Sequence, residues 1–122
     1  MVEDNIEFVE LLKEYFDERS YFLTHTDSVS VAKKILSESA FDLLILDLHL
    51  SSPSGEYGSG IDVVHFARER MKLLIPIVIV TGLELVSKKV LLDQGVTRAY
   101  NKPLDMPFDQ FVDELASLIP MS

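Results

Sequence analysis

Two nearly continuous apolar runs constrain the fold of this chain more than any other feature of its sequence. The run from Phe41 to Leu50 reads FDLLILDLHL, and the run from Ile75 to Val80 reads IPIVIV. Strands that are apolar on both faces are typical of a parallel sheet buried between two layers of helices. The sequence therefore predicts an α/β fold in which these two runs are buried strands.

Helical patterns alternate with the predicted strands along the whole chain. Asn5 is expected to cap a first helix whose apolar residues fall on one face. Further helices are expected after Asp27 or Ser28, from Gly60 to about Met71, from Leu83 to Gln94 with Gly95 as its cap, and from Pro107 onward. Further strands are expected at Tyr21–Thr26 and Thr97–Asn101. A strand–helix unit repeated five times predicts a doubly wound parallel sheet with helices on both faces.

Length, composition and charge exclude several classes of protein. The 122 residues suit one domain, and the absence of cysteine excludes disulfides, thiolate metal sites and a cysteine nucleophile. A formal net charge of −9 disfavours direct binding of nucleic acid. The longest apolar runs reach only strand length, and the first residues do not resemble a signal peptide. We therefore expect a cytoplasmic domain that neither spans a membrane nor contacts nucleic acid directly.

The residues that end the predicted strands have side chains suited to phosphoryl chemistry. Ligands of doubly wound sheets bind beyond the carboxyl ends of the strands, where this chain places Glu3, Asp4, Asp47, Thr81 and Lys102. Three carboxylates in one corner would repel one another without a cation, and oxygen ligands alone favour Mg²⁺. One carboxylate can attack phosphorus, while the metal, an ammonium and a hydroxyl neutralise the phosphoryl oxygens.

Four segments of the chain together resemble the signature segments of response-regulator receiver domains. They occur in the family's order and span almost the whole chain: Glu3-Asp4-Asn5, Leu43–Asp47, Ile77–Gly82 and Asn101-Lys102-Pro103. Each segment alone is weakly specific, but the four together, each closing a predicted strand, are specific. The resemblance implies one receiver domain over residues 1–122, with a flavodoxin-like five-stranded sheet in the order 2-1-3-4-5.

The resemblance also implies a role for each site residue. Asp47 would be the phosphoacceptor. Mg²⁺ would be held by Glu3, Asp4, Asp47 and the backbone carbonyl of His49. Thr81 would hydrogen-bond a phosphoryl oxygen, and Lys102 would pair with Asp47 or with the phosphoryl group. The peptide bond between Lys102 and Pro103 would be cis, as is usual in the family.

By the same resemblance, the chain would act in a two-component phosphorelay as a signalling switch and not as an enzyme acting on other molecules. A sensor histidine kinase or a histidine phosphotransfer protein would supply the phosphoryl group. The domain would catalyse its own phosphorylation and dephosphorylation, and would then change its protein contacts. A homodimer could form through the helix at 83–94, the strand at 97–101 and the last helix, although the mixed charges there are more often solvated.

Three features depart from the family pattern. Only two residues precede Glu3, so the first strand is expected to be short. The segment from Ser51 to Ser59 is long, and is either a tolerated surface insertion or a lid with Tyr57 as a partner contact. Ala99 stands where the family usually has a switch aromatic, and strand alternation points Tyr100 to the other face.

Two other functions stay open, the first because of these departures and the second because flavodoxin-like proteins share the fold. The first is a pseudo-receiver that binds a partner without being phosphorylated. The second is a flavodoxin-like binder of a nucleotide or flavin, which is disfavoured because no glycine-rich phosphate loop follows the first strand. His25 and His65 are expected to be surface or packing residues.

Overall fold

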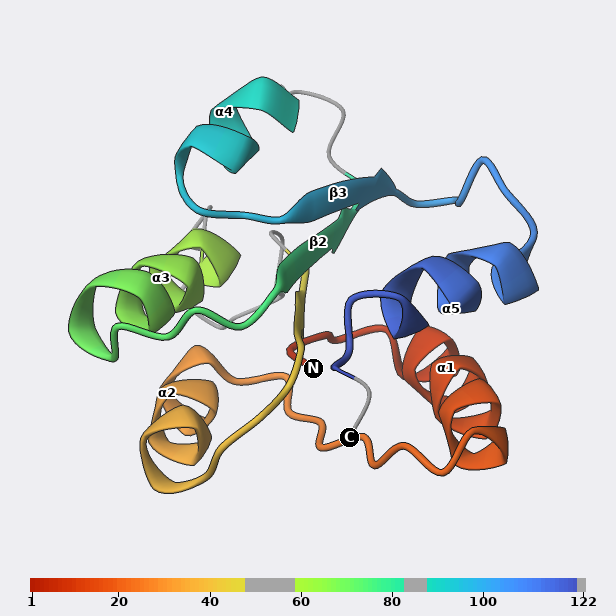
Figure 1. Cartoon of the computed structure of the whole chain (residues 1–122), viewed down its shortest axis with the longest axis horizontal. Coiled ribbons are helices and arrows are strands. Elements are labelled where there is room, and N and C mark those ends of the chain that lie inside the picture. The colour runs from red at the N-terminus through yellow and green to blue at the C-terminus, as the bar shows by residue number, and fades with distance from the viewer. Residues whose placement is uncertain (48–58, 83–87, 121–122) are drawn as a thin grey trace.

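The computed structural model describes residues 1–47, 59–82 and 88–120 (Figure 1). Its helices are α1 (Ile6–Glu18), α2 (Val29–Glu38), α3 (Ser59–His65) with the π-helical segment η1 (Phe66–Arg70) following it, α4 (Lys88–Asp93) and α5 (Phe108–Ala116). The regular strands are β1 (Leu44–Leu46), β2 (Ile77–Thr81) and β3 (Arg98–Asn101). They form one parallel sheet in the order β1-β2-β3. The predicted α/β class with a parallel sheet is confirmed.

The first two predicted strands are reduced to single bridges in the described residues. Val2 pairs in parallel with Thr26 on one side and with Leu46 on the other. Val2 N–H donates to the Ile45 carbonyl at 2.8 Å, and Asp47 N–H donates to the Val2 carbonyl at 2.9 Å. Residues 21–25 do not form the regular strand that the sequence predicted; in the part of the chain that the structure describes, Thr26 is the residue of this segment that bridges to Val2. The five-stranded order therefore stays a prediction.

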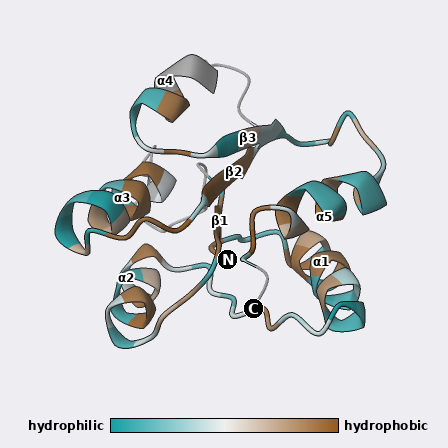
Figure 2. Cartoon of the chain, in the orientation of Figure 1, coloured by the Kyte–Doolittle hydropathy of each residue, from teal (hydrophilic) through white to brown (hydrophobic). Residues whose placement is uncertain are grey.

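Alternating side chains of the sheet build two separate cores. Leu44, Leu46, Ile77 and Ile79 face α2, α3 and α4, and form the α2-side core with Ala32, Leu36, Val63, Val64, Ala67 and Leu91. Ile45, Val78, Val80 and Tyr100 face α1 and α5, and form the α5-side core with Leu12, Phe16, Phe111, Val112 and Leu115. Figures 1 and 2 show these helices on opposite faces of a sheet whose strands β1 and β2 are apolar. Full burial of an aliphatic side chain stabilises a fold by about 1.5–3 kcal/mol. The apolar side chains buried on each face of the sheet therefore both contribute to the stability of the domain.

The helix starts follow the expected capping chemistry. The side chain of Asn5 accepts a hydrogen bond from Phe8 N–H at 3.3 Å, as predicted for α1. Of the two candidate caps for α2, Ser28 is the one used, and its hydroxyl accepts from Val31 N–H at 3.3 Å. Pro107 directly precedes the first residue of α5. The predicted helix from Leu83 is described only from Lys88, since residues 83–87 lie outside the described ranges.

The third predicted helix ends in a π-helical segment that the sequence did not indicate. Within η1, Arg68 reaches the turn that precedes β3: its Nε donates to the Gly95 carbonyl at 3.0 Å. Its Nη1 donates to the Leu73 carbonyl at 2.8 Å. One guanidinium therefore joins the end of this helix to the segment that precedes β2 and to the turn that precedes β3. Across the described residues, no helix has the length and apolar character needed to cross a membrane.

Candidate functional site

The three acids predicted to form a cation site lie together at the carboxyl ends of the strands. Glu3 follows the bridged residue Val2, and Asp47 follows β1. Ligand oxygens of Glu3, Asp4 and Asp47 all lie within 4.8 Å of one another. Glu3 is 1% exposed and Asp47 is 5% exposed, whereas Asp4 faces solvent. The cluster is therefore a pocket of two buried carboxylates with a third at its rim.

Lys102 brings its ammonium into this cluster from the end of β3. Its Nζ donates to Asp47 Oδ2 at 3.2 Å and also to Glu3 Oε1. The same Nζ lies 5.5 Å from the centroid of the Phe8 ring, a cation–π distance that helps to hold the ammonium over the site. Its backbone N–H donates to the Thr81 carbonyl at 2.8 Å, and the peptide bond between Lys102 and Pro103 is cis, as predicted.

Glu3 is held by the backbone that follows it. Its Oε2 accepts hydrogen bonds from the N–H groups of Asp4 at 3.0 Å and Asn5 at 3.5 Å. Burial, together with a hydrogen bond and charge repulsion from Asp47, raises the pKa of Glu3 to about 7, although Lys102 opposes this change. The carboxyl group of Glu3 therefore retains a proton near neutral pH when no cation neutralises the cluster.

The pKa of the Lys102 ammonium is also raised by its acidic neighbours. Burial alone would lower its pKa, but the hydrogen bonds and negative charges of Glu3 and Asp47 outweigh that effect and raise the pKa. Lys102 is therefore charged across the physiological range. The pair of buried acids always has one fixed positive partner.

Thr81 is the last residue of β2, the strand next to β1, and its side chain is buried. In register it lies beside Asn101 of β3, so it ends its strand at the same edge of the sheet as Asp47 and Lys102. The structure thus brings Glu3, Asp4, Asp47, Thr81 and Lys102 to one edge. His49 and residues 51–58, including Tyr57, lie outside the described residues.

Two side chains at the site were not recognised from the sequence as part of it. Phe8 was expected only as a residue on the apolar face of α1, yet its ring lies under Lys102. His25 was expected to pack or face solvent, yet its Nε2 lies 2.6 Å from the Glu3 carbonyl oxygen. Helical periodicity placed Phe8 on the inner face, but nothing in the sequence indicated either contact.

The alternation predicted for β3 is confirmed. Tyr100 packs in the α5-side core, with its ring centroid 4.9 Å from that of Phe111. Its hydroxyl donates to Glu114 Oε1 at 3.0 Å, and burial raises the pKa of the phenol. Ala99 packs against the opposite, α2-side core. The strand therefore presents a methyl group on that face and its aromatic ring on the other.

The fold of this chain, a parallel sheet between two layers of helices, is shared with solved receiver domains. The structure is similar to a receiver domain of a Francisella response regulator (17% identity, TM-score 0.78, covering 96% of this chain and 91% of that one). It is also similar to the non-phosphorylated HemR receiver domain of Leptospira biflexa (26% identity, TM-score 0.78, 99% and 92% covered).

A third similar structure is the response regulator TrrA of Thermotoga maritima, described in complex with Mg²⁺–BeF (24% identity, TM-score 0.76, 97% and 95% covered). The sequence profile of the response regulator receiver domain matches residues 1–111, and the chain belongs to this family. A comparison with curated protein sequences gave no match.

Proposed function

We propose that this chain is a phosphoacceptor switch of a two-component phosphorelay, with Asp47 as the residue that takes the phosphoryl group. The observation that supports this most directly is the surroundings of Asp47. Its carboxylate lies among two further acids, and the ammonium of Lys102 lies 3.2 Å from Asp47 Oδ2. A nucleophilic carboxylate with a fixed positive neighbour can accept a phosphoryl group whose charge is neutralised as it arrives.

The donor set fits Mg²⁺. Three carboxylates and one ammonium leave a formal charge of −2 when all are ionised, which a divalent cation balances. The three cluster residues offer only oxygen ligands, which hard cations prefer. Glu3, Asp4 and Asp47 would hold the ion, with the backbone carbonyl of His49 as a further ligand. When bound, the ion would neutralise charge on the phosphoryl oxygens.

The proposed reaction needs little from the protein beyond positioning and charge. An oxygen of Asp47 attacks phosphorus of a phosphohistidine, the P–N bond breaks as the O–P bond forms, and the imidazole leaves and takes up a proton from solvent. Lys102 compensates the negative charge on the phosphoryl oxygens, and the Thr81 hydroxyl donates a hydrogen bond to one of them. In the later dephosphorylation step, the oxygen of a water molecule bonds to phosphorus as the bond between Asp47 oxygen and phosphorus breaks. Inorganic phosphate leaves, a proton from the water passes to solvent, and the Asp47 carboxylate is restored.

The remaining expectations belong to the same proposal. A sensor histidine kinase or a phosphotransfer protein would be the donor, and the phosphorylated form would change its protein contacts by a population shift. Residues 1–122 would act as one cytoplasmic receiver domain with the strand order 2-1-3-4-5, catalysing only its own phosphorylation and dephosphorylation. A homodimer would use the face formed by α4, β3 and α5.

Incubation with Mg²⁺ and acetyl phosphate, followed by intact mass measurement, tests the proposal. We expect one phosphoryl adduct that Asp47→Asn abolishes and that chelation of the cation prevents. Asp42→Asn is the matched control, because Asp42 is exposed and precedes the same strand. Absence of the adduct, together with absence of a beryllofluoride complex, would favour the pseudo-receiver. An adduct that persists in Asp47→Asn would contradict the choice of nucleophile.

A further inference from the structure

The ammonium of Lys102 has two kinds of partner at the acidic cluster. Glu3 and Asp47 accept its hydrogen bonds, and the ring of Phe8 lies below Nζ with its centroid 5.5 Å away. The lysine side chain is only 18% exposed. In the proposed reaction this ammonium has to exchange a carboxylate oxygen for a phosphoryl oxygen, so a partner that stays in contact during the exchange would matter to the rate.

Other aromatic side chains fix the ring of Phe8. It meets Phe108 edge-to-face with the ring centroids 5.8 Å apart, and it meets Phe111 in a tilted arrangement at 6.0 Å. Phe108 and Phe111 also contact each other at 5.6 Å. Because Phe111 is fully buried in the α5-side core, the three rings are anchored to the interior of the domain. Phe8 is therefore a fixed surface beside a flexible lysine side chain.

Hydrogen bonds link this ring to the carboxylate that Lys102 contacts. Asn5 N–H donates to Glu3 Oε2 at 3.5 Å, and Phe8 N–H donates to Asn5 Oδ1 at 3.3 Å. The other oxygen of the same carboxylate, Glu3 Oε1, accepts from Lys102 Nζ. The loop that presents the acid therefore also sets the position of the ring.

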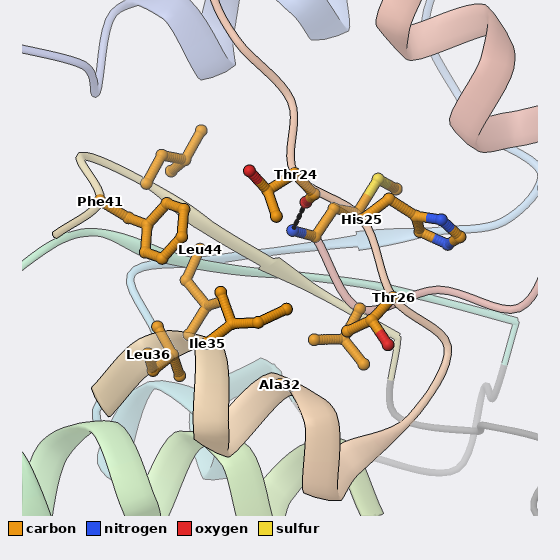
Figure 3. A pocket seen from close by; sticks show the side chains of 11 residues that line it. Thr24, His25, Thr26, Ala32, Ile35, Leu36, Phe41 and Leu44 are labelled. Atoms are coloured by element: carbon orange, nitrogen blue, oxygen red, sulfur yellow. Dashed lines mark hydrogen bonds between the residues drawn. The ribbon is translucent and has the colours of Figure 1, made fainter. Parts of the chain in front are cut away.

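Glu3 is held from its other side as well. The ring of His25 is directed away from the apolar pocket lined by Thr24, Phe41 and Leu44 (Figure 3). Its Nε2 lies 2.6 Å from the carbonyl oxygen of Glu3, which is a hydrogen-bond distance. The backbone of Glu3 is thus held between His25 and the start of α1, and the ammonium lies between a fixed carboxylate and a fixed ring.

An aromatic ring suits this position because it attracts a cation without accepting a directed hydrogen bond. The attraction comes from the negative face of the ring and acts over a range of positions above it. The ammonium can therefore move toward a phosphoryl oxygen and remain over the ring, whereas a further carboxylate there would compete with the phosphoryl group. An open hollow of about 530 Å³, lined by both Phe8 and Lys102, gives an unrestrained lysine room to turn away from the site.

We infer that Phe8 is a positioning residue for phosphoryl transfer, which keeps the Lys102 ammonium beside Asp47 while that ammonium exchanges a carboxylate for a phosphoryl oxygen. This inference rests on the proposed function and adds a residue to it. Phe8 acts through Lys102 and offers no ligand to a cation. It should therefore affect the rate at which Asp47 is phosphorylated and leave the affinity of the acidic cluster for Mg²⁺ unchanged.

Fluorinated phenylalanines at position 8 test this inference, because each added fluorine weakens the negative ring face and changes the shape of the ring little. The rate of adduct formation is measured by intact mass at saturating Mg²⁺ and one acetyl phosphate concentration. We expect the rate to fall stepwise, by about threefold or more from phenylalanine to trifluorophenylalanine. The same series at Phe16, a buried residue of α1 whose ring contacts Tyr21, is the matched control and should not change the rate.

An equal rate across the series at position 8 would overturn the inference while leaving the proposed function intact. A fall that is just as steep at Phe16 would also overturn it, because the effect would then be one of packing. Absence of any adduct on the native chain would instead refute the proposed function, and this inference with it.

Nuclear magnetic resonance gives a readout that needs no phosphorylation. Cε of Lys102 is bonded to Nζ, so the ring current of Phe8 should move its proton signal upfield of those of the other lysines. The signal is assigned by its absence in Lys102→Arg. We expect Phe8→Leu to abolish the upfield shift and Phe8→Tyr, which keeps a ring, to retain it. A Lys102 signal that Phe8→Leu leaves unchanged would overturn the inference whether or not the adduct forms.

Discussion

Replacing Glu3 with glutamine should change how the stability of the domain depends on pH. In the native chain, burial and the neighbouring Asp47 hold the pKa of Glu3 at about 7, compared with 4.5 for an ordinary glutamate. The native state therefore keeps a proton on Glu3 at pH values where the unfolded chain has lost it. Stability from this group is fully present below pH 4.5 and is lost as the pH rises toward 7.

The size of this effect follows from the two pKa values. A tenfold change in proton affinity corresponds to about 1.4 kcal/mol. A pKa near 7 in place of 4.5 therefore lowers the free energy of unfolding by up to about 3 kcal/mol above neutral pH. The amino group of Met1, whose pKa burial lowers to about 5, acts in the opposite direction over an overlapping range. The difference between the native chain and the variant isolates Glu3 from this second group.

Denaturant unfolding between pH 5 and pH 8, with a chelator present, measures that difference. We expect the stability of Glu3→Gln relative to the native chain to increase with pH by about 2–3 kcal/mol across this range. Glu7→Gln is the matched control, because Glu7 is exposed in the first turn of α1. Parallel pH profiles for the native chain and Glu3→Gln would refute the reasoning, since Glu3 would then titrate normally in the folded state.

Addition of Mg²⁺ extends the same experiment. A cation bound by the ionised cluster competes with the proton on Glu3, so its affinity should increase as the pH rises toward 7. A ligand at a hundred times its dissociation constant stabilises the folded state by about 2.7 kcal/mol. We therefore expect a given Mg²⁺ concentration to stabilise the native chain more at pH 8 than at pH 6. The same stabilisation at both pH values would show that Mg²⁺ binding does not displace a proton from Glu3, and would contradict this expectation.

Three further substitutions test the packing, each by denaturant unfolding. Leu115→Ala should lower stability by about 2–5 kcal/mol, because Leu115 is fully buried in the α5-side core; a loss below 1 kcal/mol would mean that the site collapses around the smaller side chain. Gly95→Ala should cost about 1–2 kcal/mol, since Gly95 has φ +100° and an added Cβ would lie 3.1 Å from Arg68 Cγ; an unchanged midpoint would contradict that geometry. Tyr100→Phe should cost about 1 kcal/mol by removing the hydrogen bond to Glu114, and the cost should vanish in a Glu114→Ala background, which lacks the acceptor, if that bond is its cause.

Helices and site residue types were predictable from the sequence, whereas strand lengths were not. Apolar periodicity and capping residues give α1 with its start at Asn5, and α2 with its start at Asp27 or Ser28, because both signals are local; the structure selects Ser28. The apolar run from Phe41 is longer than β1, which begins at Leu44. Strand length depends on a paired neighbour, and in the described residues β1 is bridged on one side by Val2 through Leu46. No pattern within the run itself carries that information.

The site shows the same division between residue types and contacts. The strand ends indicated Glu3, Asp47 and Lys102, because parallel strands bring their carboxyl ends to one edge. The division of the Lys102 ammonium between two acids, and the ring of Phe8 beneath it, depend on how α1 packs against the end of β3. The contacts with the two acids join residues 55 and 99 positions apart, and local periodicity cannot specify them.

The division of the interior into two cores gives the two faces of the molecule separate tolerances to mutation. Leu36 and Leu115 belong to different cores, with the sheet between them. Changes in such residues have no shared neighbours and should add independently, whereas changes within one core should interact. One face of the domain can therefore diverge while the residues beneath the other stay as they are.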